Sequence, residues 1–117
     1  MATFRDLLAA AKAEIREVDT ETAATEISAG ALVLDVREPD EFEHARVPGA
    51  TLVPLATVPQ NIAAFHGEDT TYVICRSGGR SRQACEYLAA QGADVANVSG
   101  GLMAWIASGR DVVSGPA

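Results

Sequence analysis

Short apolar runs alternate with segments of helical periodicity along the chain. Residues 31–36 (ALVLDV) form a continuous apolar run with β-branched positions, bounded by Gly30 and by Arg37-Glu38-Pro39. Residues 71–75 (TYVIC) form a second such run. Runs of this kind are typical of strands that are buried on both faces in a parallel sheet. Shorter strands are predicted at residues 51–53 and 94–98.

Segments of helical character separate the predicted strands. Phe4, Leu8, Ala11 and Ile15 recur at helical spacing, which predicts a helix over residues 3–17 capped by Thr3. Asp19 and Gly30 are suited to begin and end a second helix. Further helices are predicted at residues 57–65, 81–91 and 102–108. Alternation of strands and helices predicts an α/β fold with a mainly parallel sheet.

Composition and charge narrow the class of protein. The chain has 117 residues, of which 48% are hydrophobic and 21% charged, and this predicts one folded domain. A net charge of −7 and few aromatic residues argue against nucleic-acid binding. No apolar run approaches the ~20 residues of a membrane-spanning helix, so no membrane insertion is expected. Acidic residues near the N-terminus do not fit a signal peptide, and two cysteines make no disulfide framework, so we expect a cytoplasmic protein with free thiols.

The segment of residues 72–88 carries the candidate chemistry. Cys75 ends a predicted strand, and Ser81 opens a predicted helix. Between them lies a polar, glycine-rich loop made of Arg76, Ser77, Gly78, Gly79 and Arg80. Ligands of open α/β sheets bind beyond the carboxyl ends of the strands, which is where this loop is predicted to lie.

The loop is expected to favour an anion at Cys75. Two glycines allow backbone N–H groups to turn inward, and the helix N-terminus adds partial positive charge. Arg76 and Arg80 add two full charges. We therefore expect an open, electropositive loop in which the pKa of Cys75 lies below that of a free cysteine, so that the nucleophilic thiolate dominates. Cys85, with Ala84, Leu88 and Ala89 around it on the predicted helix, is expected to be a core residue.

Three motifs together resemble the rhodanese family of sulfurtransferases. The stretch from Cys75 to Ser81 resembles the active-site loop of that family. Residues 34–55 resemble its first motif, with matches at Asp35, Val36, Arg37, Glu41, Phe42, Pro48, Gly49 and Ala50. Residues 99–113 resemble its closing motif, with matches at Gly100, Gly101, Ala104, Trp105 and Gly109. The resemblance runs from about residue 17 to residue 113.

The resemblance implies a fold and a mechanism. It implies helices on both faces of the sheet, a rhodanese-like domain over residues 17–117 and an extra helical extension over residues 1–16. Cys75 would take a sulfane sulfur from thiosulfate or a low-molecular-weight persulfide and pass it to a thiophilic acceptor, with a protein acceptor left open. Residues 76–81 would bind the donor, and Arg80 would either do so or brace the loop against a carboxylate. Asp35 and Arg37 would form structural ion pairs nearby, and no metal or organic cofactor is needed.

The sequence also shows departures and leaves alternatives open. The family often has Gly-His before the Pro48-Gly49 turn, where this chain has Ala45 and Arg46. It often has Asn where this chain has Gly79. Cysteine-based phosphatases have five residues between Cys and Arg, whereas four separate Cys75 from Arg80. Two other functions stay open from the sequence: a non-catalytic interaction module, and a sulfur carrier that serves a protein partner.

Overall fold

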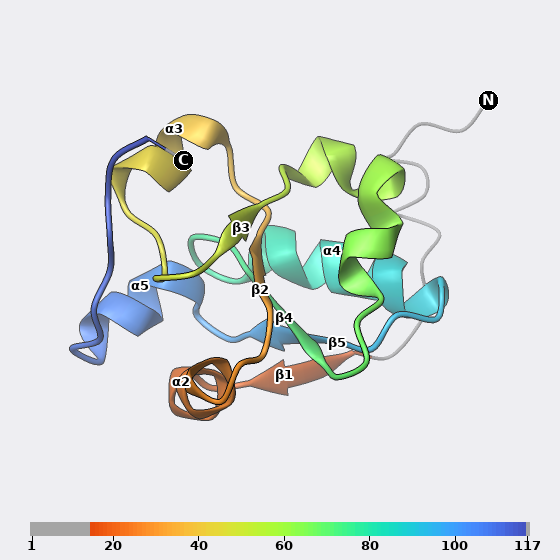
Figure 1. Ribbon diagram of the computed structural model, residues 1–117, viewed down its shortest axis with the longest axis horizontal. Helices are drawn as coiled ribbons and strands as arrows, with labels where there is room; N and C mark the ends of the chain where they lie inside the picture. Colours follow the sequence, from red (N-terminus) through yellow and green to blue (C-terminus); the bar gives the residue numbers. More distant parts are fainter. Residues whose placement is uncertain (1–14, 117) are drawn as a thin grey trace.

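Five parallel strands form a sheet at the centre of the molecule. The computed structural model describes residues 15–116. The strands are β1 (Arg16–Val18), β2 (Val33–Asp35), β3 (Thr51–Leu52), β4 (Thr71–Ile74) and β5 (Val95–Val98). Their order across the sheet is β1-β5-β4-β2-β3, and every neighbouring pair is parallel (Figure 1). The predicted α/β class with a parallel sheet is confirmed.

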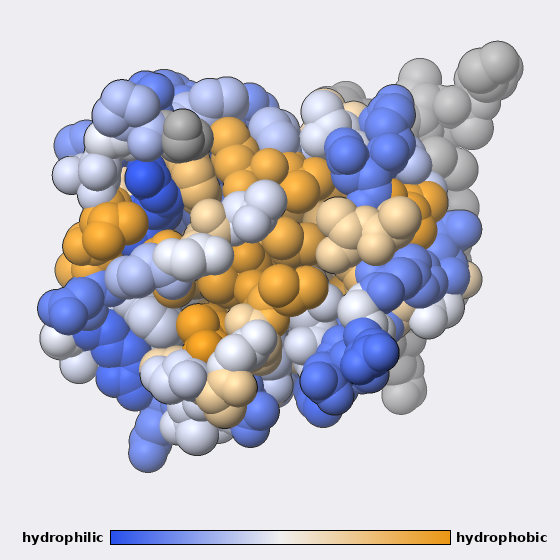
Figure 2. Space-filling model, viewed as in Figure 1, coloured by the Kyte–Doolittle hydropathy of each residue, from blue (hydrophilic) through white to orange (hydrophobic). Residues whose placement is uncertain are grey.

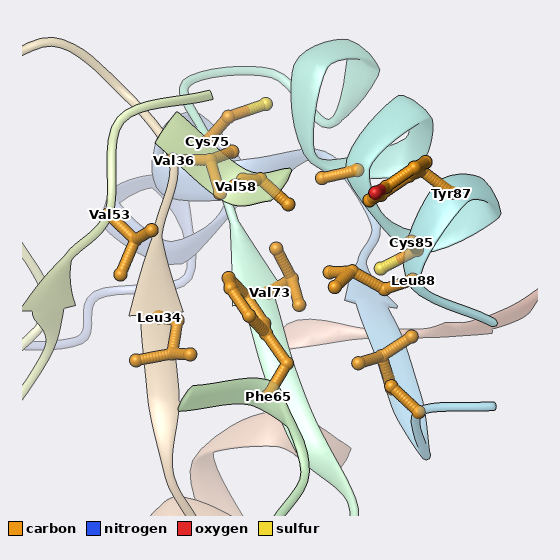
Figure 3. Packing of buried hydrophobic residues seen from close by; sticks show 13 residues of the cluster. Leu34, Val36, Val53, Val58, Phe65, Val73, Cys75, Cys85, Tyr87 and Leu88 are labelled. Atoms are coloured by element: carbon orange, nitrogen blue, oxygen red, sulfur yellow. The ribbon is translucent and has the colours of Figure 1, made fainter. Parts of the chain in front are cut away.

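Helices cover both faces of this sheet, as expected. They are α2 (Thr20–Ser28), α3 (Pro39–His44), the 3₁₀ helix η1 (Leu55–Phe65), α4 (Gly79–Ala90) and α5 (Gly101–Ala107). One core layer lies between the sheet and the pair η1 and α4, where Phe65, Val73 and Leu88 pack together (Figure 3). The other core layer packs α2 and α5 against the opposite face, through Ala23 and Trp105.

Local sequence explains where several of these elements begin. The Asp19 carboxylate accepts a hydrogen bond of 2.7 Å from the backbone N–H of Thr22 and caps α2, as predicted. The two long apolar runs form β2 and β4, each shorter than its run. All four residues of β4 are buried, because both faces of this central strand are covered by helices.

Two predicted helices differ from the structure. Residues 16 and 17 belong to β1 and not to the helix predicted over residues 3–17, while residues 1–14 of that helix lie outside the described residues. Residues 55–65 form 3₁₀ turns broken at Asn61 in place of the α-helix predicted over residues 57–65. Pro59 explains this difference, since it has no N–H to donate and its ring excludes an α-helical bond to the carbonyl of Leu55.

The C-terminal tail runs back over α3. Val113 pairs with Arg46 through two backbone hydrogen bonds of 2.9 Å, and the Arg46 guanidinium donates to the carbonyl of Gly115 at 2.8 Å. The same guanidinium lies 4.6 Å from the centre of the Phe42 ring. Arg46, a departure from the family pattern, thus fastens the tail to α3.

The molecular surface is mixed in character. On the face seen in Figure 2, hydrophobic side chains gather over β3 and adjoining segments, and hydrophilic side chains lie around them. Within residues 15–116 no helix combines the length and the apolar character that crossing a membrane requires.

Candidate active site

Cys75 lies directly after β4, at the carboxyl end of the central strand, in the turn that leads into α4. Its Sγ accepts a hydrogen bond of 3.1 Å from the backbone N–H of Gly78, and the Ser81 hydroxyl lies 3.3 Å away. The turn requires a glycine, because Gly78 has a φ of +104°, in the left-handed region. Only 1% of Cys75 is exposed, so the expectation that this residue is open to solvent is wrong, although other residues of the loop are exposed.

These contacts favour the thiolate of Cys75. Burial raises the pKa of the Cys75 thiol, but hydrogen bonds from the Ser81 side chain and from the backbone N–H groups of Ser81, Gly78 and Ser77 outweigh it. The net pKa of Cys75 lies below its ordinary value. Burial without such donors raises the pKa of Cys85 well above its ordinary value, in a fully buried position on α4. The pKa values of two buried cysteines are therefore shifted in opposite directions, because hydrogen bonds reach Sγ only at Cys75 among the contacts described.

The N-terminus of α5 anchors the backbone of the active-site loop. The backbone N–H of Leu102 donates to the carbonyl of Cys75 at 2.8 Å, and that of Met103 donates to the carbonyl of Arg76 at 3.0 Å. A Cβ at Gly101 would lie 2.5 Å from the Cys75 carbonyl oxygen, so only glycine allows this approach. This contact explains the second glycine of the Gly100-Gly101 pair in the closing motif, a role that the sequence alone does not show.

Two ion pairs hold the elements beside the loop. Arg37 and Asp35 are both buried and share hydrogen bonds of 2.8–3.1 Å, as the expected structural pair. Arg37 also donates to the carbonyl of Ala45 at 2.6 Å, which fixes the chain that follows α3. Arg80 binds both carboxylate oxygens of Glu41, at 2.7 and 2.9 Å. Of the two roles left open for Arg80, the structure therefore contains the pairing with a carboxylate.

The remaining residues of the loop lie at its surface. Arg76 is exposed, and its side chain forms no hydrogen bond or ion pair with residues 15–116. It lines a groove of about 510 Å³ between α3 and α5, whereas Cys75 belongs to the core layer on the side of α4. Gly79 has no positive φ, and a Cβ there would meet no other atom. Only Gly78 of the two glycines is therefore required by the backbone.

Sequence reasoning missed two polar residues behind the loop. Asn97 on β5 is 2% exposed, and its Oδ1 accepts a hydrogen bond of 2.5 Å from the Ser81 hydroxyl. Its Nδ2 donates to the Gly78 carbonyl at 3.1 Å and to the carboxylate of Glu17, on β1, at 3.0 Å. The available signal was an amide within an otherwise apolar strand, since a buried polar side chain needs partners.

Comparison with known proteins decides the family. A model of the rhodanese-like domain matches residues 19–108. The chain belongs to the rhodanese-like family. The match covers α2 to α5 and includes the loop between Cys75 and Ser81.

Individual rhodanese relatives are similar over most of their length. A sulfurtransferase of Allochromatium vinosum is 32% identical over 103 residues, covering 86% of this chain and 96% of that protein. A putative sulfurtransferase of Bacillus subtilis, YtwF, is 35% identical over 94 residues, covering 79% and 91%. The crystal structure of a rhodanese-related protein from Thermoplasma volcanium superposes with a TM-score of 0.78 at 31% identity, covering 84% of this chain and 97% of that one. These relatives support a sulfurtransferase at the level of the family.

Proposed function

We propose that this rhodanese domain transfers a sulfane sulfur from thiosulfate or a small persulfide to a thiophilic acceptor through a persulfide on Cys75. The observation that carries the proposal is the set of hydrogen-bond donors around one thiol, which lowers its pKa despite complete burial. A thiolate at the end of a central strand is a nucleophile in the place where α/β folds bind ligands.

The reaction has two balanced halves. The Cys75 thiolate attacks the outer sulfur of thiosulfate, a new S–S bond forms, and sulfite leaves with the electron pair of the bond that breaks. An acceptor such as cyanide then attacks the outer sulfur of the persulfide, which gives thiocyanate and restores the Cys75 thiolate. Covalent catalysis of this kind divides one transfer into two steps. The N–H groups that face Sγ hold the negative charge in the resting enzyme and in the persulfide.

The position of Arg80 favours sulfur transfer over phosphate ester hydrolysis. A cysteine-based phosphatase needs a guanidinium free to bind the phosphate oxygens. Here both oxygens of Glu41 bind Arg80, so this guanidinium braces α3 against α4. Residues 76–79 and Ser81 are proposed to surround the transferred sulfur. Asp35 and Arg37 are proposed to stabilise the neighbouring end of β2.

Three further expectations belong to this proposal. The donor is a small anionic sulfur compound, and the acceptor is a thiol that a protein can supply. The chain acts in the cytoplasm, where Cys75 and Cys85 remain reduced. Residues 1–16 form an extension to a catalytic domain of residues 17–117.

Mass spectrometry of the intact protein after incubation with thiosulfate tests the proposal. The protein should gain the mass of one sulfur atom and lose it on addition of cyanide, with formation of thiocyanate. Cys75→Ser should abolish both the gain and thiocyanate formation, whereas the matched variant Cys85→Ala should retain them. A mass gain that persists in Cys75→Ser would overturn the assignment of the nucleophile.

A further inference from the structure

A chain of three polar side chains leads from the surface of the sheet to the Cys75 thiol. The Glu17 carboxylate on β1 accepts from Asn97 on β5, and the two residues are paired in register across neighbouring strands. Asn97 contacts Ser81 on α4, and Ser81 contacts Sγ of Cys75. These three side chains come from segments far apart in the sequence, so the hydrogen-bonded network extends beyond the active-site loop.

The partners of Asn97 fix the orientation of its amide group. Carboxylate and carbonyl oxygens only accept hydrogen bonds, so the two oxygens from Glu17 and Gly78 require the NH₂ group of Asn97 to face them. The Oδ1 atom must then face Ser81. An amide oxygen only accepts, so the contact of 2.5 Å is a bond that the Ser81 hydroxyl donates.

The Ser81 hydroxyl has one proton and three acceptors within reach. These are Oδ1 of Asn97 at 2.5 Å, Sγ of Cys75 at 3.3 Å and the carbonyl oxygen of Gly78 at 3.3 Å. A hydroxyl donates one hydrogen bond, so a proton directed to Asn97 is withheld from Cys75. With Ser81 turned this way, its oxygen presents a lone pair to Sγ and suits a protonated thiol. A thiolate instead requires the Ser81 proton to turn toward the sulfur.

We propose that Asn97 is a positioning residue, which competes with Cys75 for the single proton of Ser81 and so sets how readily Cys75 ionises. When Cys75 loses its proton to solvent, the Ser81 O–H turns from Asn97 to Sγ, and Ser81 keeps its own proton throughout. Asn97 Oδ1 then has no donor, which opposes the change. This inference rests on the proposed role of Cys75 as the nucleophile.

Other charged groups lie around these three side chains, and none of them is substituted in the test. Glu17 also accepts from Ser99 at 2.7 Å and from Arg82 of α4 at 3.4 Å. Arg80 of α4 is paired with Glu41 of α3, and Asp35 of β2 is paired with Arg37. Cys85 lies in the same core layer as Cys75. None of these groups is altered in the variants of Ser81, Asn97 and Ser99 used below.

The test is the pH dependence of Cys75 alkylation by iodoacetamide, followed on the peptide that contains it. Asn97→Leu removes the competing acceptor and should lower the pH midpoint of Cys75 alkylation by about one unit. Below the midpoint, the fraction of Cys75 present as thiolate should then rise about tenfold. Ser81→Ala removes the donor and should raise the midpoint. Ser99→Ala is the matched control, since it removes a hydroxyl that donates to Glu17 and leaves Ser81 and Asn97 in place, and it should leave the midpoint unchanged.

The double variant Ser81→Ala/Asn97→Leu shows whether Asn97 acts through Ser81. Its midpoint should equal that of Ser81→Ala alone, because Asn97 has no proton to compete for once the hydroxyl is gone. The inference would be overturned if the alkylation midpoint in Asn97→Leu is unchanged or higher. It would also be overturned if Asn97→Leu still lowers the midpoint when Ser81 is already alanine. These titrations need no sulfur donor, so they are separate from the test of persulfide formation.

A measurement on the unmodified chain covers the case in which Asn97→Leu does not fold. The sequence has two asparagines, Asn61 and Asn97, so selective labelling of the side-chain carbonyl carbon gives two resonances. The Asn97 signal should shift with the ionisation of Cys75 as its hydrogen bond breaks, and most of that shift should vanish in Ser81→Ala. The exposed Asn61, whose amide donates to the Thr57 carbonyl, is the internal control. An Asn97 signal that ignores Cys75 contradicts the inference.

Discussion

Asp35 and Arg37 form a buried ion pair that holds the elements beside the active-site loop in place. The two side chains are 1% and 4% exposed. A buried carboxylate keeps its charge only while its partner compensates for the lost water. Arg37 also binds backbone carbonyls after and within α3, so the pair connects the end of β2 to the segment that carries Glu41.

Removal of Arg37 should therefore be costly. We expect Arg37→Leu to lower the free energy of unfolding by about 3–5 kcal/mol, because the Asp35 carboxylate is left buried and unpaired. The control is Arg16→Ala, which breaks a pair with Asp94 whose side chains are 55% and 57% exposed, and should cost less than ~1 kcal/mol. Urea denaturation measures both. Equal losses in the two variants would show that burial of the Asp35–Arg37 pair does not matter.

The two cysteines should react at very different rates even though both are buried. Thiolate is the reactive form, and the pKa of Cys75 is lowered while that of Cys85 is raised. In native protein near neutral pH, Cys75 should be alkylated much faster than Cys85, and in denaturant the two rates should converge. Timed labelling with iodoacetamide and peptide mapping separates the sites. Faster labelling of Cys85 in the native state would mean that the hydrogen bonds at Cys75 are wrongly assigned.

At the scale of elements, the loop is held between two helix N-termini. α4 begins directly after the turn at Gly78, and α5 donates two backbone N–H groups to the loop carbonyls. The closest approach is at Gly101, whose φ is +58°. Helices placed in this way set the loop geometry through backbone contacts, which depend on glycine at a few positions and not on the neighbouring side chains.

Adjacent glycines offer a matched test of that statement. Gly78→Ala should disturb the loop and sharply reduce persulfide formation, because alanine is strained at a φ of +104° and its Cβ would lie 3.3 Å from the Gly100 nitrogen. Gly79→Ala should leave activity nearly intact and raise stability by up to ~1 kcal/mol, since a Cβ there meets open space at a helical position. Activity and thermal unfolding are measured on both. If Gly79→Ala is the more damaging, the turn differs from the one described.

The pair of Glu41 and Arg80 fastens α3 to α4 and should show its effect in the pH dependence of stability. The Arg80 guanidinium lowers the pKa of Glu41 from 4.5 to about 2. The unfolded state therefore binds more protons between these two values, so stability from this group is complete above pH 4.5 and is lost as pH falls to about 2.

Glu41→Gln isolates this contribution, since the amide still permits a hydrogen bond to the Glu38 N–H that helps to begin α3. The side chains of Glu41 and Arg80 are 28% and 35% exposed. Solvent screening therefore limits the difference in unfolding free energy between wild type and variant at neutral pH to ~1 kcal/mol. The difference between wild type and variant should shrink to nothing between pH 4.5 and 2. Unfolding in urea across this range measures it, and a difference that persists at the lowest pH would refute the ion pair as its source.

At the scale of the whole molecule, the sequence predicts elements with strong patterns and misses contacts between distant segments. The apolar runs of β2 and β4 and the cap at Asp19 are visible locally, as is the loop after Cys75. β1 is only three residues long and is stable because β5 pairs with it, so its own pattern is too short to show it. Asn97 and Glu17 are hydrogen-bonded across 80 residues of sequence, and burial of Cys75 depends on packing in the core layer on the side of α4. Such features arise from tertiary structure.

The overall charge sets the last expectation. A chain of net charge −7 repels an anionic donor at long range, so an exposed cation beside the loop should assist its capture. Arg76 is such a residue, with an unpaired side chain among residues 15–116. We expect Arg76→Ala to raise the KM for thiosulfate several-fold at low salt with little change in kcat, because a contact equal in ground and transition states affects binding alone.

Salt and position distinguish steering by Arg76 from a structural effect. The KM ratio between variant and wild type should approach one at high ionic strength, where the Debye length falls to ~3 Å at 1 M. Arg16→Ala removes the same charge at β1, where the ion pair with Asp94 lies beyond the amino end of the sheet, and should hardly change KM. Rates of thiocyanate formation across thiosulfate concentrations at two salt levels give both ratios. An unchanged KM in Arg76→Ala at low salt would show that the net charge of the chain, and not this residue, governs the approach of the donor.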